Sequence, residues 1–168
     1  MLYIEDGMIQ READLSELFS EGQGKPSCCF LTIGELKKVK TDSPMQQIIE
    51  HEMESGAYTK YERHDTSDLI NMRIPPFSAK REGGETICFY IKKDLLLAVY
   101  NETELDPDLE TLLKEIIKYN LTPGKMLLDL IEWYTHEDTH LLQNVEEEVT
   151  DLEDALISST MEDHKKSI

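Results

Sequence analysis

The residues whose types and spacing could do chemistry lie close together in the last third of this chain. The stretch 133-WYTHEDTHLLQ-143 contains His136, Glu137 and His140, which together spell H-E-x-x-H. On a helix this pattern places two imidazoles one turn apart, where they can bind zinc, and the glutamate can activate the water on the metal. The motif therefore raises the hypothesis of a zinc-dependent hydrolase.

The helix that carries this motif favours a different interpretation. Proline and apolar spacing predict a long helix from about residue 123 to residue 159. A heptad pattern runs along it through Leu128, Ile131, Thr135, Asp138, Leu142, Val145, Val149, Leu152 and Leu156. With Leu128 at position a, His136 and His140 take outer positions, where no third ligand and no apolar shell accompany them. We therefore interpret the motif as part of the solvent-exposed face of a helix that packs against a partner, and keep the hydrolase as an alternative.

The composition excludes several classes of partner. The chain has 168 residues, with 17 Lys and Arg against 35 Asp and Glu, a formal net charge of −18. Nucleic-acid binding depends on a positive face that displaces counterions, and an anionic membrane surface also needs one. The three cysteines form a poor disulfide framework and favour a reducing, cytoplasmic setting. No secretory signal and no apolar run of about 20 residues occurs, so we expect no membrane span in the chain as given.

The predicted long helix is rich in carboxylate side chains. Between residues 126 and 161 the chain contains no Lys or Arg, and like charges such as Glu147 and Asp151 recur one turn apart. Like charges at this spacing destabilise a helix by a few tenths of a kcal/mol per pair. Either bound cations such as Mg²⁺ or Ca²⁺ offset this repulsion, or the carboxylates form a solvated face.

The elements before this helix predict a single α/β domain. We expect a hairpin turning at Asp6-Gly7, an interior strand at 28–33, a helix at 44–55 and four strands close in sequence that form an antiparallel meander. Short helices are predicted at 13–22 and 107–119. The predicted fold is a mixed, largely antiparallel sheet flanked by helices in αβα layers. Residues 1–122 form the α/β part, and residues 123–168 form the long acidic helix with a frayed tail.

Two stretches resemble the cytoplasmic domain of CorA-type divalent-cation transporters. They are 88-CFYIKKDLLLAVYNE-102 and 126-MLLDLIEWYTHEDTHLLQNVEEEVTDLEDAL-156. The resemblance implies a regulatory, metal-sensing domain rather than an enzyme. In this family five copies form a funnel, and Mg²⁺ bound between neighbouring copies holds the pore shut. Two apolar membrane helices with a Gly-Met-Asn loop follow the domain, so we expect membrane attachment only through segments beyond Ile168, at the cytoplasmic side.

The resemblance also points to candidate metal ligands. One metal site in the family uses an acidic residue on the helix that precedes the central strands. Here that helix is 44–55, and its carboxylates are Glu50, Glu52 and Glu54, of which one or none is the equivalent. Besides the zinc hydrolase, a second alternative to the transporter domain stays open. It is a free-standing interaction module whose acidic helix docks a basic or helical partner.

Overall fold

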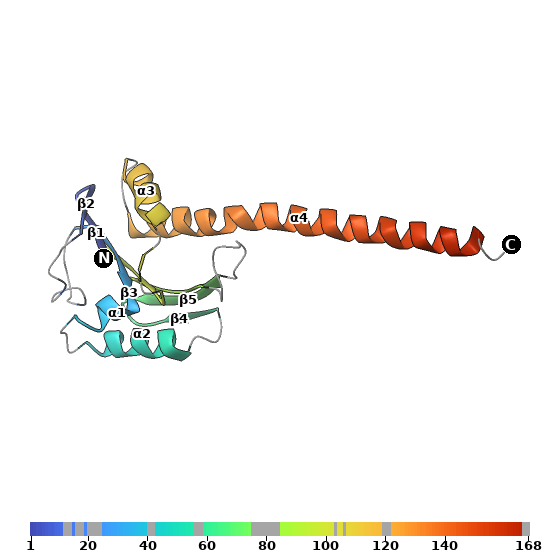
Figure 1. Ribbon diagram of the computed structural model, residues 1–168. Coiled ribbons are helices and arrows are strands. Elements are labelled where there is room, and N and C mark those ends of the chain that lie inside the picture. Colours follow the sequence, from blue (N-terminus) through green and yellow to red (C-terminus); the bar gives the residue numbers. More distant parts are fainter. Residues whose placement is uncertain are drawn as a thin grey trace. The chain divides into compact units, whose positions relative to one another are not determined.

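The computed structural model describes residues 1–11, 15, 19, 25–39, 43–55, 59–74, 85–102, 104–105, 107–118 and 122–165. Within the last of these ranges, the side chains of 136–141 and of 154–165 are not described. The chain divides into two compact units, Met1–Ile131 and Glu132–Ile168. Its elements are β1 (Leu2–Glu5), β2 (Met8–Gln10), β3 (Ser27–Thr32), α1 (Ile33–Leu36), α2 (Pro44–Ser55), β4 (Lys60–Arg63), β5 (Asp68–Ile74), β6 (Glu85–Ile91), β7 (Leu95–Tyr100), α3 (Pro107–Ile116) and α4 (Pro123–Lys165) (Figure 1).

The first unit is built on a seven-stranded sheet in the order β2-β1-β3-β7-β6-β5-β4. All neighbouring strands are antiparallel except β3 and β7, which pair in parallel from Ser27↔Leu95 to Thr32↔Tyr100. The strands β4 to β7 form the predicted antiparallel meander. The expectation of a mixed, largely antiparallel sheet is therefore confirmed.

The N-terminal hairpin turns where the sequence predicts it. Asp6 and Gly7 both have positive φ, of 51° and 73°, which is the backbone of a type I′ turn. The turn matches the right-handed twist of the two flanking strands, so β1 and β2 pair directly. A Cβ added at Gly7 would lie 3.6 Å from Cγ2 of Ile117, just past the end of α3.

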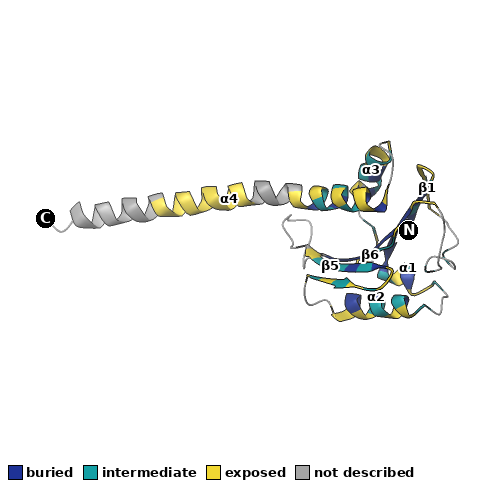
Figure 2. Cartoon of the chain, turned by 180° about the vertical axis from the view of Figure 1, so that it is seen from behind, coloured by how far each residue is buried: buried dark blue, intermediate teal, exposed yellow. Residues whose placement is uncertain are grey.

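Helices cover both faces of the sheet in this unit. Every residue of β3 and of β7 is buried, as expected for interior strands that read as continuous apolar runs. On one face Ile49 and Met53 of α2 join a core cluster with Cys29, Leu69 and Cys88. Figure 1 shows α3 and the first turns of α4 on the other side of the sheet. The buried residues of these two segments include Leu109, Leu113, Met126 and Leu130 (Figure 2).

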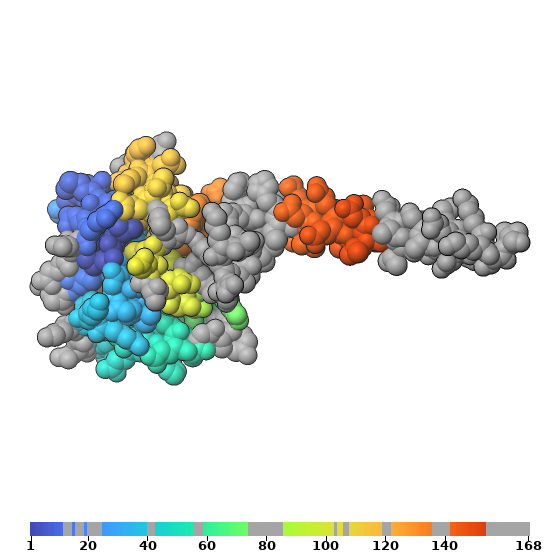
Figure 3. Space-filling view, in the orientation of Figure 1, coloured from blue at the N-terminus to red at the C-terminus, as the bar shows by residue number. Residues whose placement is uncertain are grey.

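Local interactions begin α1 and α2, and the side chain of Gln46 then joins the two helices. Thr32 caps α1 through a capping box with Glu35. Pro44 stands at the first position of α2, where its missing N–H is not needed. The buried side chain of Gln46 then donates from Nε2 to the carbonyl oxygens of Leu36 and Val39, each at 3.2 Å. The two helices therefore lie side by side on the surface of the first unit (Figure 3).

The second unit contains the greater part of α4. The predicted apolar seam is exposed on it, and the exposed fractions are 67% for Leu142, 47% for Val145, 49% for Val149 and 65% for Leu152 (Figure 2). The Thr150 hydroxyl donates to the carbonyl oxygen of Glu146 at 2.8 Å, which keeps that hydroxyl satisfied within the helix.

None of the helices described here has both the length and the apolar character that crossing a membrane would require. Most of the predicted short helix 13–22 falls outside the described residues.

Candidate cation-binding carboxylates

The three candidate carboxylates of α2 lie on two different faces of the helix. Glu50 and Glu54 are four residues apart, so their side chains share one face and lie one turn from each other. Glu52 lies between them in sequence and points to the opposite face, where it is buried. The three residues therefore do not form one site.

One carboxylate of the outer pair forms an ion pair with the lysine at the C-cap of α1. The ammonium group of Lys37 donates to Oε1 of Glu54 at 2.7 Å, and both side chains are exposed. The hydrogen bond to Glu54 raises the pKa of Lys37, and the negative charges of Glu54 and then Glu50 add to this effect. The Glu50 carboxylate itself accepts a hydrogen bond from Nε2 of Gln46 at 2.8 Å. Exposed ion pairs contribute about 0–1 kcal/mol, so Lys37 can exchange readily with a dissolved cation.

The inner carboxylate is held by the sheet. Oε2 of Glu52 lies 2.6 Å from the ammonium nitrogen of Lys60, on β4. The same nitrogen donates to Oε1 of Glu62 at 3.1 Å. Sequence reasoning missed Lys60 and Glu62 because only the folded sheet places that face of β4 under α2. The alternation of Lys60 and Glu62 along the strand was the one available signal, since residues two apart share a face.

Hard oxygen donors are the common feature of these residues, and they fit Mg²⁺ better than a soft metal. Among the residues whose side chains are described, no group of three or more His, Cys, Asp or Glu is arranged to hold a metal ion. Glu50 and Glu54 could supply two carboxylates to a Mg²⁺ ion that keeps much of its water. One copy of the domain thus offers part of a coordination shell, and the rest has to come from water or from a second surface.

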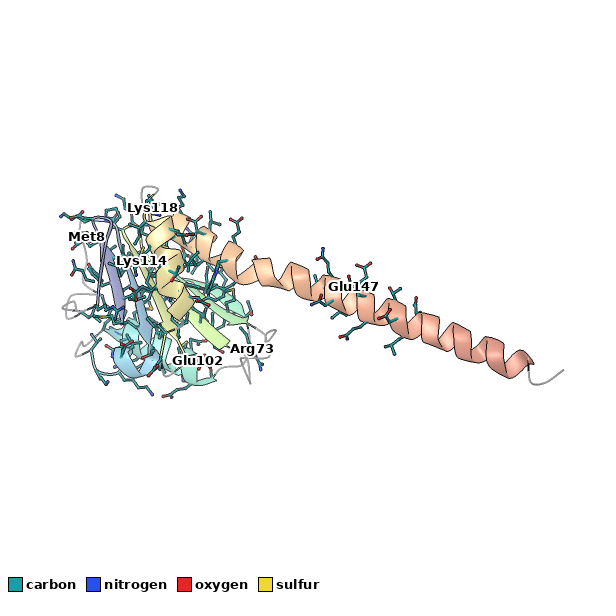
Figure 4. The ribbon with its side chains drawn as sticks, turned by 45° about the horizontal axis from the view of Figure 1, so that its top comes forward. Met8, Arg73, Glu102, Lys114, Lys118 and Glu147 are labelled. Atoms are coloured by element: carbon teal, nitrogen blue, oxygen red, sulfur yellow. The ribbon has the colours of Figure 1, made fainter. Side chains whose placement is uncertain are left out.

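The H-E-x-x-H motif lies within the helical backbone of α4, as predicted. The side chains of His136, Glu137 and His140 lie outside the described residues, so the structure does not test whether they could bind zinc. Further along the helix, exposed carboxylates follow one another (Figure 4), namely Glu146, Glu147, Glu148, Asp151 and Glu153.

The cysteines offer no nucleophile. Cys28, Cys29 and Cys88 are free and buried. Burial raises the pKa of each thiol to about 12, so the thiolate is scarce at neutral pH.

Comparison with known proteins agrees with the fold. Residues 33–168 match the family described as CorA-like Mg²⁺ transporter protein. Among solved structures, the chain is similar to the complete structure of the CorA magnesium transporter from Methanocaldococcus jannaschii, with 20% sequence identity and a TM-score of 0.55. The match covers 94% of this chain and 51% of that one, so this chain spans about half the length of that transporter. A search of curated proteins found no match.

A mixed sheet between helical layers, followed by a long helix, defines an α/β domain of the kind found in divalent-cation transporters. The chain belongs to the CorA-like Mg²⁺ transporter family. The predicted resemblance is confirmed, and because this family consists of transporters rather than enzymes, the zinc hydrolase is set aside as the activity of the chain.

Proposed function

We propose that this chain is the regulatory, cation-sensing domain of a CorA-like transporter, and that it lies on the cytoplasmic side of the membrane. In this proposal Mg²⁺ binds between neighbouring copies and favours their closed assembly. Bound cation stabilises the state in which facing carboxylates are close, because it relieves their repulsion only there. Family membership by itself assigns neither this regulatory role nor the ligands of the cation.

The observation that carries the proposal is the placement of Glu50 and Glu54. Their side chains share one face of α2, one turn apart. The exposed Lys37 forms an ion pair with the exposed Glu54, and Gln46 donates a hydrogen bond to the half-buried Glu50. A weakly held lysine and two hard oxygen donors make a surface that a millimolar cation can compete for. The site is completed by groups of a neighbouring copy, which couples cation binding to assembly.

The test is to follow assembly and stability of the chain while Mg²⁺ is varied. Sedimentation velocity and thermal unfolding are measured in EDTA and in about 10 mM MgCl₂, with ionic strength matched by NaCl. We expect Mg²⁺ to raise both the sedimentation coefficient and the unfolding midpoint. The double variant Glu50→Gln/Glu54→Gln is expected to lose most of this response.

A matched control keeps the change in net charge the same. Glu102 and Glu115 are exposed residues outside α2, and Glu102 is labelled in Figure 4. The double variant Glu102→Gln/Glu115→Gln is expected to respond to Mg²⁺ as the unaltered chain does. If the unaltered chain shows no response beyond that of NaCl, the sensing role is wrong, and if both double variants lose the response equally, the α2 site is wrong.

A further inference from the structure

A lysine lies between two carboxylates from different elements on the sheet side of α2. The ammonium nitrogen of Lys60 is 2.6 Å from Oε2 of Glu52 and 3.1 Å from Oε1 of Glu62. The Glu52 side chain is only 10% exposed, so Lys60 replaces part of the water that this carboxylate has lost. Removing the partner of a largely buried carboxylate leaves its charge uncompensated and destabilises the fold.

A buried amide oxygen without a hydrogen bond belongs to a residue on the same face of the sheet. Asn71 of β5 is the register partner of Lys60, so the two side chains stand on the same face of the sheet, directly opposite each other. Asn71 is 2% exposed, and its Oδ1 accepts no hydrogen bond. Buried oxygens of this kind are normally satisfied. Two carboxylates therefore contact the ammonium group of a single lysine, and an amide oxygen without a hydrogen bond belongs to the residue opposite that lysine in the sheet.

We propose that Lys60 is a built-in cation occupying a divalent-cation site formed by Glu52, Glu62 and Asn71. The three side chains supply hard oxygen donors from α2, β4 and β5, the ligand types that Ca²⁺ and Mg²⁺ take. One ammonium charge balances only one of the two carboxylates, whereas a divalent cation would balance both. This inference goes beyond the proposed function, which uses the opposite face of α2, and it assigns to the inner site a structural cation that never leaves.

The contacts of Lys60 keep its ammonium group between the two carboxylates. Its nitrogen lies within hydrogen-bonding distance of both, at 2.6 Å from Oε2 of Glu52 and 3.1 Å from Oε1 of Glu62. The tether also gives Lys60 an advantage over any dissolved ion, because it is present at a high effective concentration. The unaltered chain should therefore bind no divalent cation at Glu52.

Removing the lysine is the direct test. We compare Lys60→Met with Lys37→Met, which removes the exposed pair with Glu54 and the same charge. Both are titrated with CaCl₂ and MgCl₂ by calorimetry, and their thermal unfolding is followed with and without these salts. We expect Lys60→Met to be destabilised without divalent cation, to recover most of the loss when Ca²⁺ is added, and to bind one Ca²⁺ at least about tenfold more tightly than Lys37→Met.

The outcomes that overturn the inference are equally definite. A Lys60→Met protein whose unfolding midpoint rises with Ca²⁺ no more than that of Lys37→Met contradicts it, as does a variant that stays unfolded with Ca²⁺ present. A second measurement uses the unaltered chain with Mn²⁺, whose paramagnetism broadens nearby amide signals. Broadening at Glu52, Glu62 and Asn71 would show that Lys60 does not fill the site. This result is separate from the proposed function, which is tested by the effect of Mg²⁺ on the assembly and stability of the unaltered chain and of the Glu50→Gln/Glu54→Gln variant.

Discussion

Thr32 and Glu35 each satisfy a backbone N–H of the other at the point where β3 becomes α1. The Thr32 hydroxyl accepts from the N–H of Glu35 at 3.2 Å, and the Glu35 carboxylate accepts from the N–H of Thr32 at 2.8 Å. A helix of four residues contains very few backbone hydrogen bonds of its own. This reciprocal cap therefore largely determines whether α1 forms. Because α1 carries the buried Leu36 and leads to Lys37, the cap also positions one side of the candidate cation surface.

Loss of the Thr32 hydroxyl should therefore destabilise the first unit. We expect Thr32→Val to lower the free energy of unfolding by about 1 kcal/mol, as loss of an N-cap usually does. Urea unfolding followed by circular dichroism measures the change. Thr32→Ser keeps the hydroxyl and should retain most of the stability, whereas equal losses in both variants would show that the methyl group matters instead of the cap.

The hairpin turn should be intolerant of a side chain at Gly7. Its φ of +73° lies in the left-handed region, so we expect Gly7→Ala to cost about 1 kcal/mol in the free energy of unfolding. The control is Gly124→Ala in the first turn of α4, where an added Cβ meets nothing within 4 Å and helix propensity favours alanine. Thermal unfolding of the two variants should shift in opposite directions, and a neutral Gly7→Ala would mean that the turn has a different backbone in solution.

Burial predicts a large difference between two leucines. Leu97 is fully buried in β7, and Leu→Ala at such a site costs about 2–5 kcal/mol in the free energy of unfolding. Leu142 of the apolar seam is 67% exposed, so Leu142→Ala should change the free energy of unfolding by less than about 0.5 kcal/mol. Denaturant titration compares the two. A large loss in Leu142→Ala would mean that another surface covers the seam in solution.

The buried thiols predict a loss of stability in alkali. Burial raises the pKa of Cys28, Cys29 and Cys88 from 9.0 to about 12, so the folded state holds these protons more tightly than the unfolded chain does. Their contribution to stability is complete below about pH 9 and is lost as the pH rises from 9 towards 12. Urea unfolding between pH 8 and 11 measures the loss, at about one pH unit per step.

A variant without thiols separates this effect from the titration of lysines and tyrosines. The triple substitution of the cysteines by alanine should show a smaller decline over the same pH interval. At pH 8 the thiols of the folded chain should also resist a disulfide reagent that modifies all of them once the chain is unfolded. Rapid modification of the folded chain would contradict their burial.

Much of the fold could be predicted because the local signals were strong. Asp6-Gly7 identified the hairpin, Pro44 the start of α2, and the run 28–33 an interior strand, since each signal depends on nearby residues alone. The long helix was predicted from its proline and its heptad spacing, although its described backbone continues to Lys165. The proposed boundary between 122 and 123 stays a prediction.

The candidate site was less accessible to sequence reasoning. The helix that carries Glu50, Glu52 and Glu54 was predicted from local signals, and the family resemblance made its carboxylates candidates. Which carboxylate faces water, however, depends on the packing of α2 against the sheet. The bonds from Lys37 and Lys60 join residues that are 17 and 8 positions away from their partners, across turns whose geometry the local sequence does not specify. The alternation with Lys60 along β4 was the one signal that pointed to Glu62, and no motif marked Asn71.

The parallel pairing of β3 with β7 has a consequence for how the chain is made. During synthesis β3 emerges from the ribosome early. Its partner strand β7 emerges only after α2 and the rest of the meander, several seconds later at ordinary synthesis rates. During that interval the apolar run of β3 has β1 on one edge and no neighbour on the other. The nascent domain should therefore complete its sheet in one late, cooperative step, and a stall in translation before Tyr100 would leave an aggregation-prone edge open.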